Sequence, residues 1–208
     1  STPSNSSAAS DVYKRQTLDF QLQKDIEALL KSYVRSLKEW EITNAAALVM
    51  DNESGEILSF VGSADFFDSS HQGQVNGVTS LRQPGSTLKP FTYALAIDQG
   101  MTAATLIEDT QIHIQVGGVE YLPKNYDGKF HGLVRLREAL ACSYNVSAIR
   151  VLEKIGVDSL LRKLKELGFT SLDREANYYG LGLTLGNGEV TLLELVRAYS
   201  TLARAGIF

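Results

Sequence analysis

Apolar residues recur at helical spacing over much of the chain. Between Thr17 and Trp40 a large apolar side chain returns every three or four positions, which predicts an amphipathic helix capped by Thr17 or Asp19. The same spacing predicts later helices over 134–155, 158–167 and 191–205. In the last of them Thr191 is the expected N-cap, and Glu194 stands at the capping-box position.

Shorter apolar segments between these helices predict strands. Residues 45–50 and 56–61 flank the turn sequence 51–55, so we expect a hairpin there. Residues 111–116 alternate between polar and apolar, and 119–122 are expected to pair back onto them. A two-stranded hairpin is marginal on its own. The pattern therefore predicts an α+β fold with an incomplete sheet and a helical cluster.

The segment after Pro84-Gly85 combines an apolar helix with two polar residues at its start. Residues 91–97 are almost wholly apolar, which predicts a buried helix, and Pro90 suits its first turn. Ser86 and Lys89 would then lie one turn apart, about 5–6 Å at Cβ. A serine nucleophile needs an adjacent base, and a buried lysine can be that base. The alternative is a surface helix start with a capping serine and a solvated lysine, which the apolar flank disfavours.

A second polar pair interrupts the apolar pattern of 134–155. Ser143 and Asn145 are two residues apart, so a regular helix would not place them on one face. They become a matched pair only if the backbone bends or breaks between them. The alternative is that both simply face solvent in a continuous helix. Polar groups among apolar neighbours are costly unless they are hydrogen-bonded.

Composition narrows the remaining possibilities. The 208 residues, 44% hydrophobic and 21% charged, suit one domain or slightly more. We expect residues 1–16 to be a disordered leader or an expression artefact and 17–208 to form the domain. The net charge of −4, without a basic stripe, argues against nucleic acid as a partner.

Other reactive side chains are assigned structural roles. The single cysteine, Cys142, excludes an internal disulfide and is expected to be a buried small apolar residue. The three histidines lack metal-ligand spacing, so no metal site is expected. The glycine-rich segment 178–188 is predicted to be a loop, and it lacks the Lys-Ser/Thr of a phosphate-binding loop. Glu175 and Asn177 match poorly the deacylating glutamate region of class A β-lactamases.

Together, the motifs resemble a known enzyme family. Gly-Ser-Thr-Leu-Lys-Pro-Phe at 85–91 and Ser-Tyr-Asn at 143–145 resemble the first two active-site motifs of penicillin-binding protein transpeptidases. Further stretches resemble that family's opening hairpin, its approach to the second motif and its late helix, at 44–58, 125–140 and 191–199. Residues 61–65 and 93–100 resemble the class A, penicillin-binding protein 1C-like group. The resemblance implies a β-lactamase/transpeptidase-like α+β fold.

The resemblance also implies a role for each motif residue. Ser86 would attack the carbonyl of the D-Ala-D-Ala bond of a peptidoglycan stem peptide, and Lys89 would take its proton. Ser143 would relay a proton to the leaving D-alanine, and Asn145 would orient Lys89 and the substrate amide. An amine of a neighbouring stem would resolve the acyl-enzyme and form a cross-link. β-Lactam antibiotics would acylate Ser86, and no metal or organic cofactor is implied.

Two further expectations follow from the resemblance. It implies a location at the periplasmic or extracytoplasmic face of the cell membrane, through an anchor outside this chain. The third family motif, Lys-Thr-Gly or Lys-Ser-Gly, does not occur in these residues. We therefore expect a domain truncated before the third-motif strand, and a polypeptide that alone is not a competent transpeptidase. The alternatives are a β-lactamase or D,D-carboxypeptidase on the same fold, or a non-catalytic β-lactam sensor module.

Overall fold

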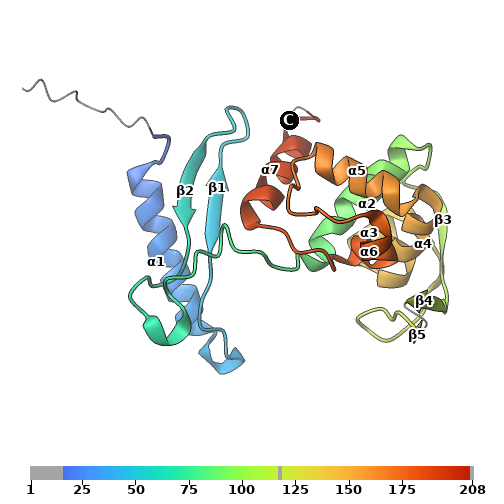
Figure 1. Ribbon diagram of the computed structural model, residues 1–208, viewed down its shortest axis with the longest axis horizontal. Coiled ribbons are helices and arrows are strands. Elements are labelled where there is room, and N and C mark those ends of the chain that lie inside the picture. The colour runs from blue at the N-terminus through green and yellow to red at the C-terminus, as the bar shows by residue number, and fades with distance from the viewer. Residues whose placement is uncertain (1–15, 117–118, 207–208) are drawn as a thin grey trace, which may run out of the picture.

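The computed structural model describes residues 16–116 and 119–206. The predicted leader, residues 1–16, lies outside these ranges except for its last residue, and its boundary with the domain stays a prediction. The predicted turn at 117–118 also lies outside the described residues. Figure 1 shows a long N-terminal helix and a hairpin beside a cluster of shorter helices.

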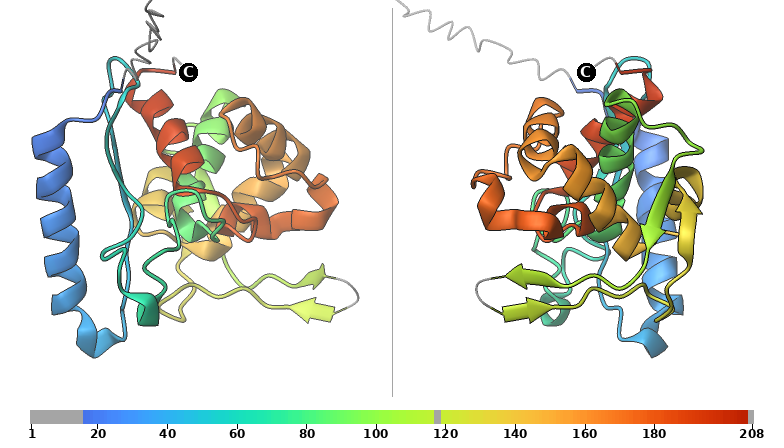
Figure 2. Two further views of the ribbon diagram at one scale, coloured as in Figure 1. Left: turned by 60° about the vertical axis from the view of Figure 1, so that its left-hand side comes forward. Right: turned by 90° about the vertical axis from the view of Figure 1, so that its right-hand side faces the viewer.

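The N-terminal layer is formed by one helix and one hairpin, as predicted. Helix α1 (Phe20–Ser36) begins where the Asp19 carboxylate accepts a hydrogen bond of 2.8 Å from the Leu22 amide. Strands β1 (Ala47–Met50) and β2 (Ile57–Val61) pair antiparallel with one register shift near the turn. Figure 2 shows α1 running alongside this hairpin.

The Gln23 side chain binds α1 to strand β2 of the hairpin. The Gln23 side-chain Oε1 accepts from the Phe60 amide at 2.8 Å and from the Ser59 hydroxyl at 2.9 Å. Its Nε2 donates to the Phe60 carbonyl at 3.1 Å. The side-chain amide of Gln23 therefore bonds to both main-chain groups of Phe60, as a neighbouring strand would. This contact protects part of an otherwise open strand edge.

The rest of the chain forms short helices and two further strand pairs. The helices are α2 (Lys89–Asp98), α3 (Leu136–Ala141), α4 (Asn145–Ile155), α5 (Val157–Glu166), α6 (Ala176–Tyr179) and α7 (Leu192–Ala203). Short 3₁₀ turns occupy Lys38–Trp40, Ser69–His71, Gly85–Leu88 and Gly180–Leu185. Antiparallel pairs join β3 (Leu106–Asp109) to β6 (Gly132–Arg135) and β4 (Ile114–Val116) to β5 (Val119–Tyr121). The β4–β5 hairpin projects from the body (Figure 2).

Two sequence predictions are wrong in detail. The single helix predicted over 134–155 is broken into α3 and α4 at Ser143, whose backbone is left-handed. It also begins two residues later than predicted, because Val134 pairs with Ile107 as part of a strand. Such pairing is decided by a distant segment, which helical periodicity does not report. The glycine-rich segment 178–188, predicted as a loop, contains the end of α6 and a 3₁₀ turn.

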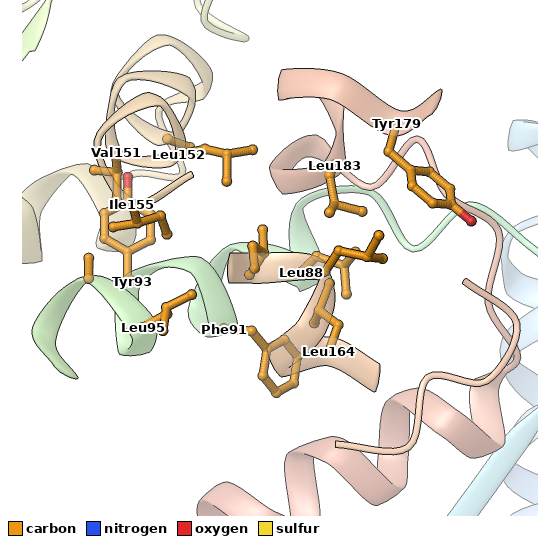
Figure 3. Packing of buried hydrophobic residues seen from close by; sticks show 14 of the residues in the cluster. Leu88, Phe91, Tyr93, Leu95, Val151, Leu152, Ile155, Leu164, Tyr179 and Leu183 are labelled. Atoms are coloured by element: carbon orange, nitrogen blue, oxygen red, sulfur yellow. The ribbon is translucent and has the colours of Figure 1, made fainter. Parts of the chain in front are cut away.

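Helix α2 lies at the centre of the main hydrophobic core, as its apolar sequence predicts. Leu88, Phe91, Tyr93 and Ala96 are each at most 1% exposed. Residues from α4, α5, α6 and the Gly180–Leu185 turn surround them, including Val151, Leu152, Ile155, Leu164, Tyr179 and Leu183 (Figure 3). Burial on this scale contributes about 1.5–3 kcal/mol for each large apolar side chain. The start of α2 is therefore anchored in the main hydrophobic core.

The fold is α+β, with three separate two-stranded sheets in the described residues. This agrees with the predicted incomplete sheet and helical cluster. Over the same ranges, no helix has both the length and the hydropathy needed to cross a bilayer.

Helix α7 is anchored by a buried carboxylate, as the capping-box prediction requires. Glu194 accepts hydrogen bonds of 2.8 Å from the amides of Thr191 and Ser171 and from the Thr170 hydroxyl. Burial alone would raise the pKa of Glu194, but these hydrogen bonds outweigh it and hold the pKa below its usual 4.5. The charged form is thus the one that stabilises the fold.

We expect Glu194→Ala to lower the free energy of unfolding by about 3 kcal/mol, because it leaves several buried donors without an acceptor. Urea denaturation at pH 7 measures this loss. Since the folded-state pKa is lowered, the stabilisation by Glu194 is present above the unfolded pKa and disappears as the pH falls through the folded one. Glu166→Gln, at an exposed ion pair with Lys163, is the control and should leave the urea midpoint almost unchanged, because water screens exposed charge pairs. An equal effect of both substitutions would contradict the anchoring role.

Candidate active site

The Ser86 turn is a 3₁₀ turn that runs directly into α2. It spans Gly85–Leu88, and Pro90 follows within the first turn of the helix, where a missing N–H costs nothing. Leu88 is fully buried, whereas Ser86 is exposed. The turn therefore presents the Ser86 hydroxyl to solvent, while Leu88 anchors the same turn in the core.

Two segments that are distant in the sequence pack against this turn. Gly186 adopts φ 76° and packs so closely that a Cβ there would lie 2.3 Å from the Gly85 amide nitrogen. The Tyr199 hydroxyl on α7 donates to the Thr87 carbonyl at 2.8 Å. The sequence analysis missed both contacts. A glycine in a turn signals backbone freedom, but only the fold reveals that Gly186 is required for close approach.

Lys89 points into a polar site made by the second motif. Its Nζ lies 2.6 Å from the Ser143 carbonyl oxygen, 3.1 Å from Ser143 Oγ and 2.7 Å from Asn145 Oδ1. An ammonium has three N–H donors, so these three acceptors match it completely. The side chain is 1% exposed, and burial lowers its pKa from 10.5 to about 8.

The backbone between α3 and α4 breaks in a way that presents the second motif. The Tyr144 amide donates to the Ala139 carbonyl and the Ser143 amide donates to the Leu140 carbonyl, which together form a Schellman motif. Ser143 takes the left-handed position at φ 54°, where glycine is usual. A serine there is strained by about 1 kcal/mol or more. The break turns the carbonyl and hydroxyl of Ser143 toward Lys89, together with the side-chain oxygen of Asn145.

The structure thus joins three of the four predicted site residues by direct hydrogen bonds. Within the described ranges the Ser86 hydroxyl has no hydrogen-bond partner, and Lys89 is bonded to the second motif instead. This arrangement has a chemical consequence. A lysine that loses one proton keeps two donors and gains a lone pair, which can accept the proton of a hydroxyl one turn away.

The predicted burial of Cys142 is wrong. The sequence analysis expected a buried apolar residue, but Cys142 is exposed and carries a free thiol. The cause is the helix break, which places Cys142 at the end of α3 instead of inside a longer helix. In the described part of the chain, no group of three His, Cys, Asp or Glu residues gathers as a metal site.

A hollow lies near the Ser86 turn, among the loop before it, the start of α7 and the segments next to the N-terminal hairpin. Its volume is about 610 Å³, and its lining includes Ala46, Gly77, Pro84, Val190 and Leu195. The lining combines residues of the hairpin, the loop before Ser86 and α7. Pro84, in this lining, stands two residues before the exposed Ser86 in the chain.

Comparison with known proteins identifies the family. The sequence profile described as the penicillin binding protein transpeptidase domain matches residues 45–208. The chain belongs to the penicillin-binding protein transpeptidase family. Penicillin-binding protein 1A of Neisseria meningitidis is 37% identical over 169 residues, which cover 79% of this chain and 20% of the relative. Penicillin-binding protein 1C of Escherichia coli is 36% identical over 191 residues, which cover 91% of this chain and 24% of the relative.

Solved structures of this family share the fold. The crystal structure of penicillin-binding protein 1A from Haemophilus influenzae matches with a TM-score of 0.68 and 34% identity, over 76% of this chain and 23% of that one. The PonA1 protein from Mycobacterium tuberculosis, solved in complex with penicillin V, matches with a TM-score of 0.75 and 23% identity, over 94% of this chain and 52% of that one. The chain spans about a quarter or less of the curated relatives named above.

Proposed function

We propose that the protein is a serine-type peptidoglycan D,D-transpeptidase that also binds penicillin covalently. The observation that carries the proposal is the position of Lys89, a buried amine with three acceptors from the second motif, one turn after an exposed serine. Membership of the transpeptidase family supports the reaction class.

The proposed acylation step begins at Ser86. The neutral amine of Lys89 accepts the hydroxyl proton while Ser86 Oγ bonds to the carbonyl carbon of the D-Ala-D-Ala peptide bond. The tetrahedral oxyanion receives a hydrogen bond from the Ser86 amide at the start of the helix, where the dipole favours negative charge. Collapse breaks the peptide C–N bond, and the proton passes from Lys89 through Ser143 Oγ, 3.1 Å away, to the leaving D-alanine amine.

Deacylation follows the same path in reverse. An amine of a neighbouring stem peptide attacks the Ser86 ester and loses its proton through Ser143 to Lys89, and the ester bond breaks to return the serine hydroxyl. The product is a cross-linked peptide. The Asn145 side chain, whose Oδ1 lies 2.7 Å from Lys89 Nζ, keeps the Lys89 amine in place during both steps. In this proposal the reaction takes place on the extracytoplasmic face of the membrane, where peptidoglycan lies.

The proposal is tested on the complete gene product with fluorescent penicillin V and with a stem peptide ending in D-Ala-D-Ala plus an amine acceptor. We expect one penicillin per protein, located by mass spectrometry on the peptide that contains Ser86. We also expect release of D-alanine together with a cross-linked peptide. Release with hydrolysis only would indicate a carboxypeptidase, and rapid loss of penicillin would indicate a β-lactamase. Stable labelling without D-alanine release would indicate a sensor.

A further inference from the structure

A buried polar network lies directly behind the second-motif break. Asp109, the last residue of β3, is 0% exposed. Its carboxylate accepts hydrogen bonds from Asn125 Nδ2 at 2.7 Å, from Ser147 Oγ at 3.1 Å, and from the backbone amide and Nδ1 of His131 at 2.9 and 2.8 Å. Burial alone would raise the pKa of Asp109, but these hydrogen bonds hold it below its usual 3.8. At neutral pH this position is therefore a fixed, buried acceptor.

Asn125 connects that carboxylate to helix α4. It is 5% exposed, and its Oδ1 accepts from the Asn145 amide at 2.8 Å and from the Val146 amide at 3.2 Å. These are the first two N–H groups of α4, which lack partners inside the helix. The N-cap residue, Tyr144, makes no capping bond with its side chain. A residue 20 positions earlier in the chain thus caps the helix that carries the second motif.

Asp109 helps to fix the orientation of the Asn125 side-chain amide. A carboxylate can only accept, so the NH₂ group of Asn125 must face Asp109 and its oxygen must face α4. The remaining N–H of Asn125 donates to the Lys129 carbonyl at 2.8 Å. The Lys129 carbonyl and the α4 N–H groups require the same orientation, and the Asp109 carboxylate adds a charged acceptor that strengthens it.

Asn145 is consequently held at both ends. Its backbone amide is fixed by Asn125, and its side-chain Nδ2 donates to the Lys124 carbonyl at 3.0 Å. Only Oδ1 then faces Lys89 Nζ, at 2.7 Å. A continuous series of hydrogen bonds thus runs from the buried Asp109 through Asn125 and Asn145 to the amine of Lys89.

We propose that Asn125, oriented by Asp109, is a positioning residue that holds Asn145 and thereby the amine of Lys89 for acyl transfer. The inference rests on the proposed function, because it assigns a task within the same site. Asn125 touches neither Lys89 nor Ser86 by hydrogen bond in the described structure, so it acts through Asn145.

The test compares two substitutions that each remove one hydrogen bond to the same buried carboxylate. In the complete gene product, Asn125→Ala should slow acylation by penicillin V at least 10-fold. Ser147→Ala, which leaves the cap of α4 intact, should stay within two-fold of wild type. Hydrogen exchange measured by mass spectrometry should rise in Asn125→Ala for the peptide that contains residues 143–147. The acylation rate of Asn125→Ala should also begin to rise at a higher pH than that of wild type. Water that reaches Lys89 would return the pKa of its amine toward 10.5.

Equal acylation rates of folded Asn125→Ala and wild type would overturn the inference, and so would an equal loss in Ser147→Ala. If Asn125→Ala does not fold, Asp109→Asn keeps the side-chain volume but removes the charged acceptor that Asn125 Nδ2 donates to. We expect it to slow acylation at least three-fold, and a wild-type rate would again reject the inference. A wild-type protein that penicillin V never labels would reject the proposed function. Hydrogen exchange would still reveal whether Asn125 holds α4.

Discussion

Replacement of Ser86 by alanine is expected to abolish covalent labelling by penicillin V, from one adduct per protein to none. The hydroxyl oxygen is the atom that would bond to the β-lactam carbonyl, whereas the neighbouring Thr87 hydroxyl is engaged with the Pro84 carbonyl at 2.7 Å. Loss of a catalytic nucleophile removes several orders of magnitude in rate, so we expect at least ~10³-fold slower labelling. Intact-protein mass spectrometry after incubation with excess penicillin V measures the change.

The fold should survive this substitution. Ser86 is exposed, and within the described ranges its hydroxyl makes no hydrogen bond, so alanine removes no structural contact. Equal thermal unfolding midpoints of variant and wild type would verify this. Ser36→Ala, at an exposed serine near the end of α1, is the matched control and should be labelled normally. An adduct that persists in Ser86→Ala would place the nucleophile elsewhere.

Replacement of Lys89 by methionine is expected to slow acylation by about 10³-fold, within the range that general-base catalysis contributes. Methionine fills a similar volume in the buried site but cannot accept a proton. Lys89→Arg should be similarly slow, because arginine keeps the charge and stays protonated at any accessible pH. The second-order rate constant with penicillin V, measured by stopped-flow fluorescence, reports both effects.

The pH dependence of the wild-type rate provides an independent check on Lys89. Burial lowers its pKa to about 8, and the neutral amine is the form that accepts the proton in the proposed mechanism. The rate should therefore rise with pH up to about 8 and level off above it, whereas both Lys89 variants should lose this rise. Lys163→Met, at an exposed ion pair on α5, is the control and should keep the wild-type profile. Wild-type kinetics in Lys89→Met would show that another group takes the proton.

Most of the local architecture could be predicted because it depends on neighbours in the chain. Asp19 and Thr191 cap their helices as the capping patterns indicate, and strands β1 and β2 pair across their predicted turn. The burial of α2 also follows from its own residues, which are apolar around the whole helix. Such features are decided within one or two turns of backbone.

The predictions that were wrong involve distant partners. Val134 carries helical spacing but joins a strand, because Ile107 pairs with it. Cys142 lies among apolar residues but is exposed, because the chain leaves α3 at this point. Asn125 begins a stretch that resembles the family's approach to the second motif, but the sequence analysis assigned no role to it or to Asp109. An asparagine or an aspartate acquires such a role only when the fold brings its partners to it.

The sequence by itself determined the spacing of Ser86 and Lys89, because residues one turn apart share a helix face wherever that helix lies. It also predicted that Ser143 and Asn145 could act together only if the helix breaks between them. Only the tertiary structure decided that the break exists and faces Lys89. The acceptors for the Lys89 amine come from residues 54 and 56 positions away. The low pKa of that amine comes from burial by packed helices, a property of the assembled core that local sequence patterns do not specify.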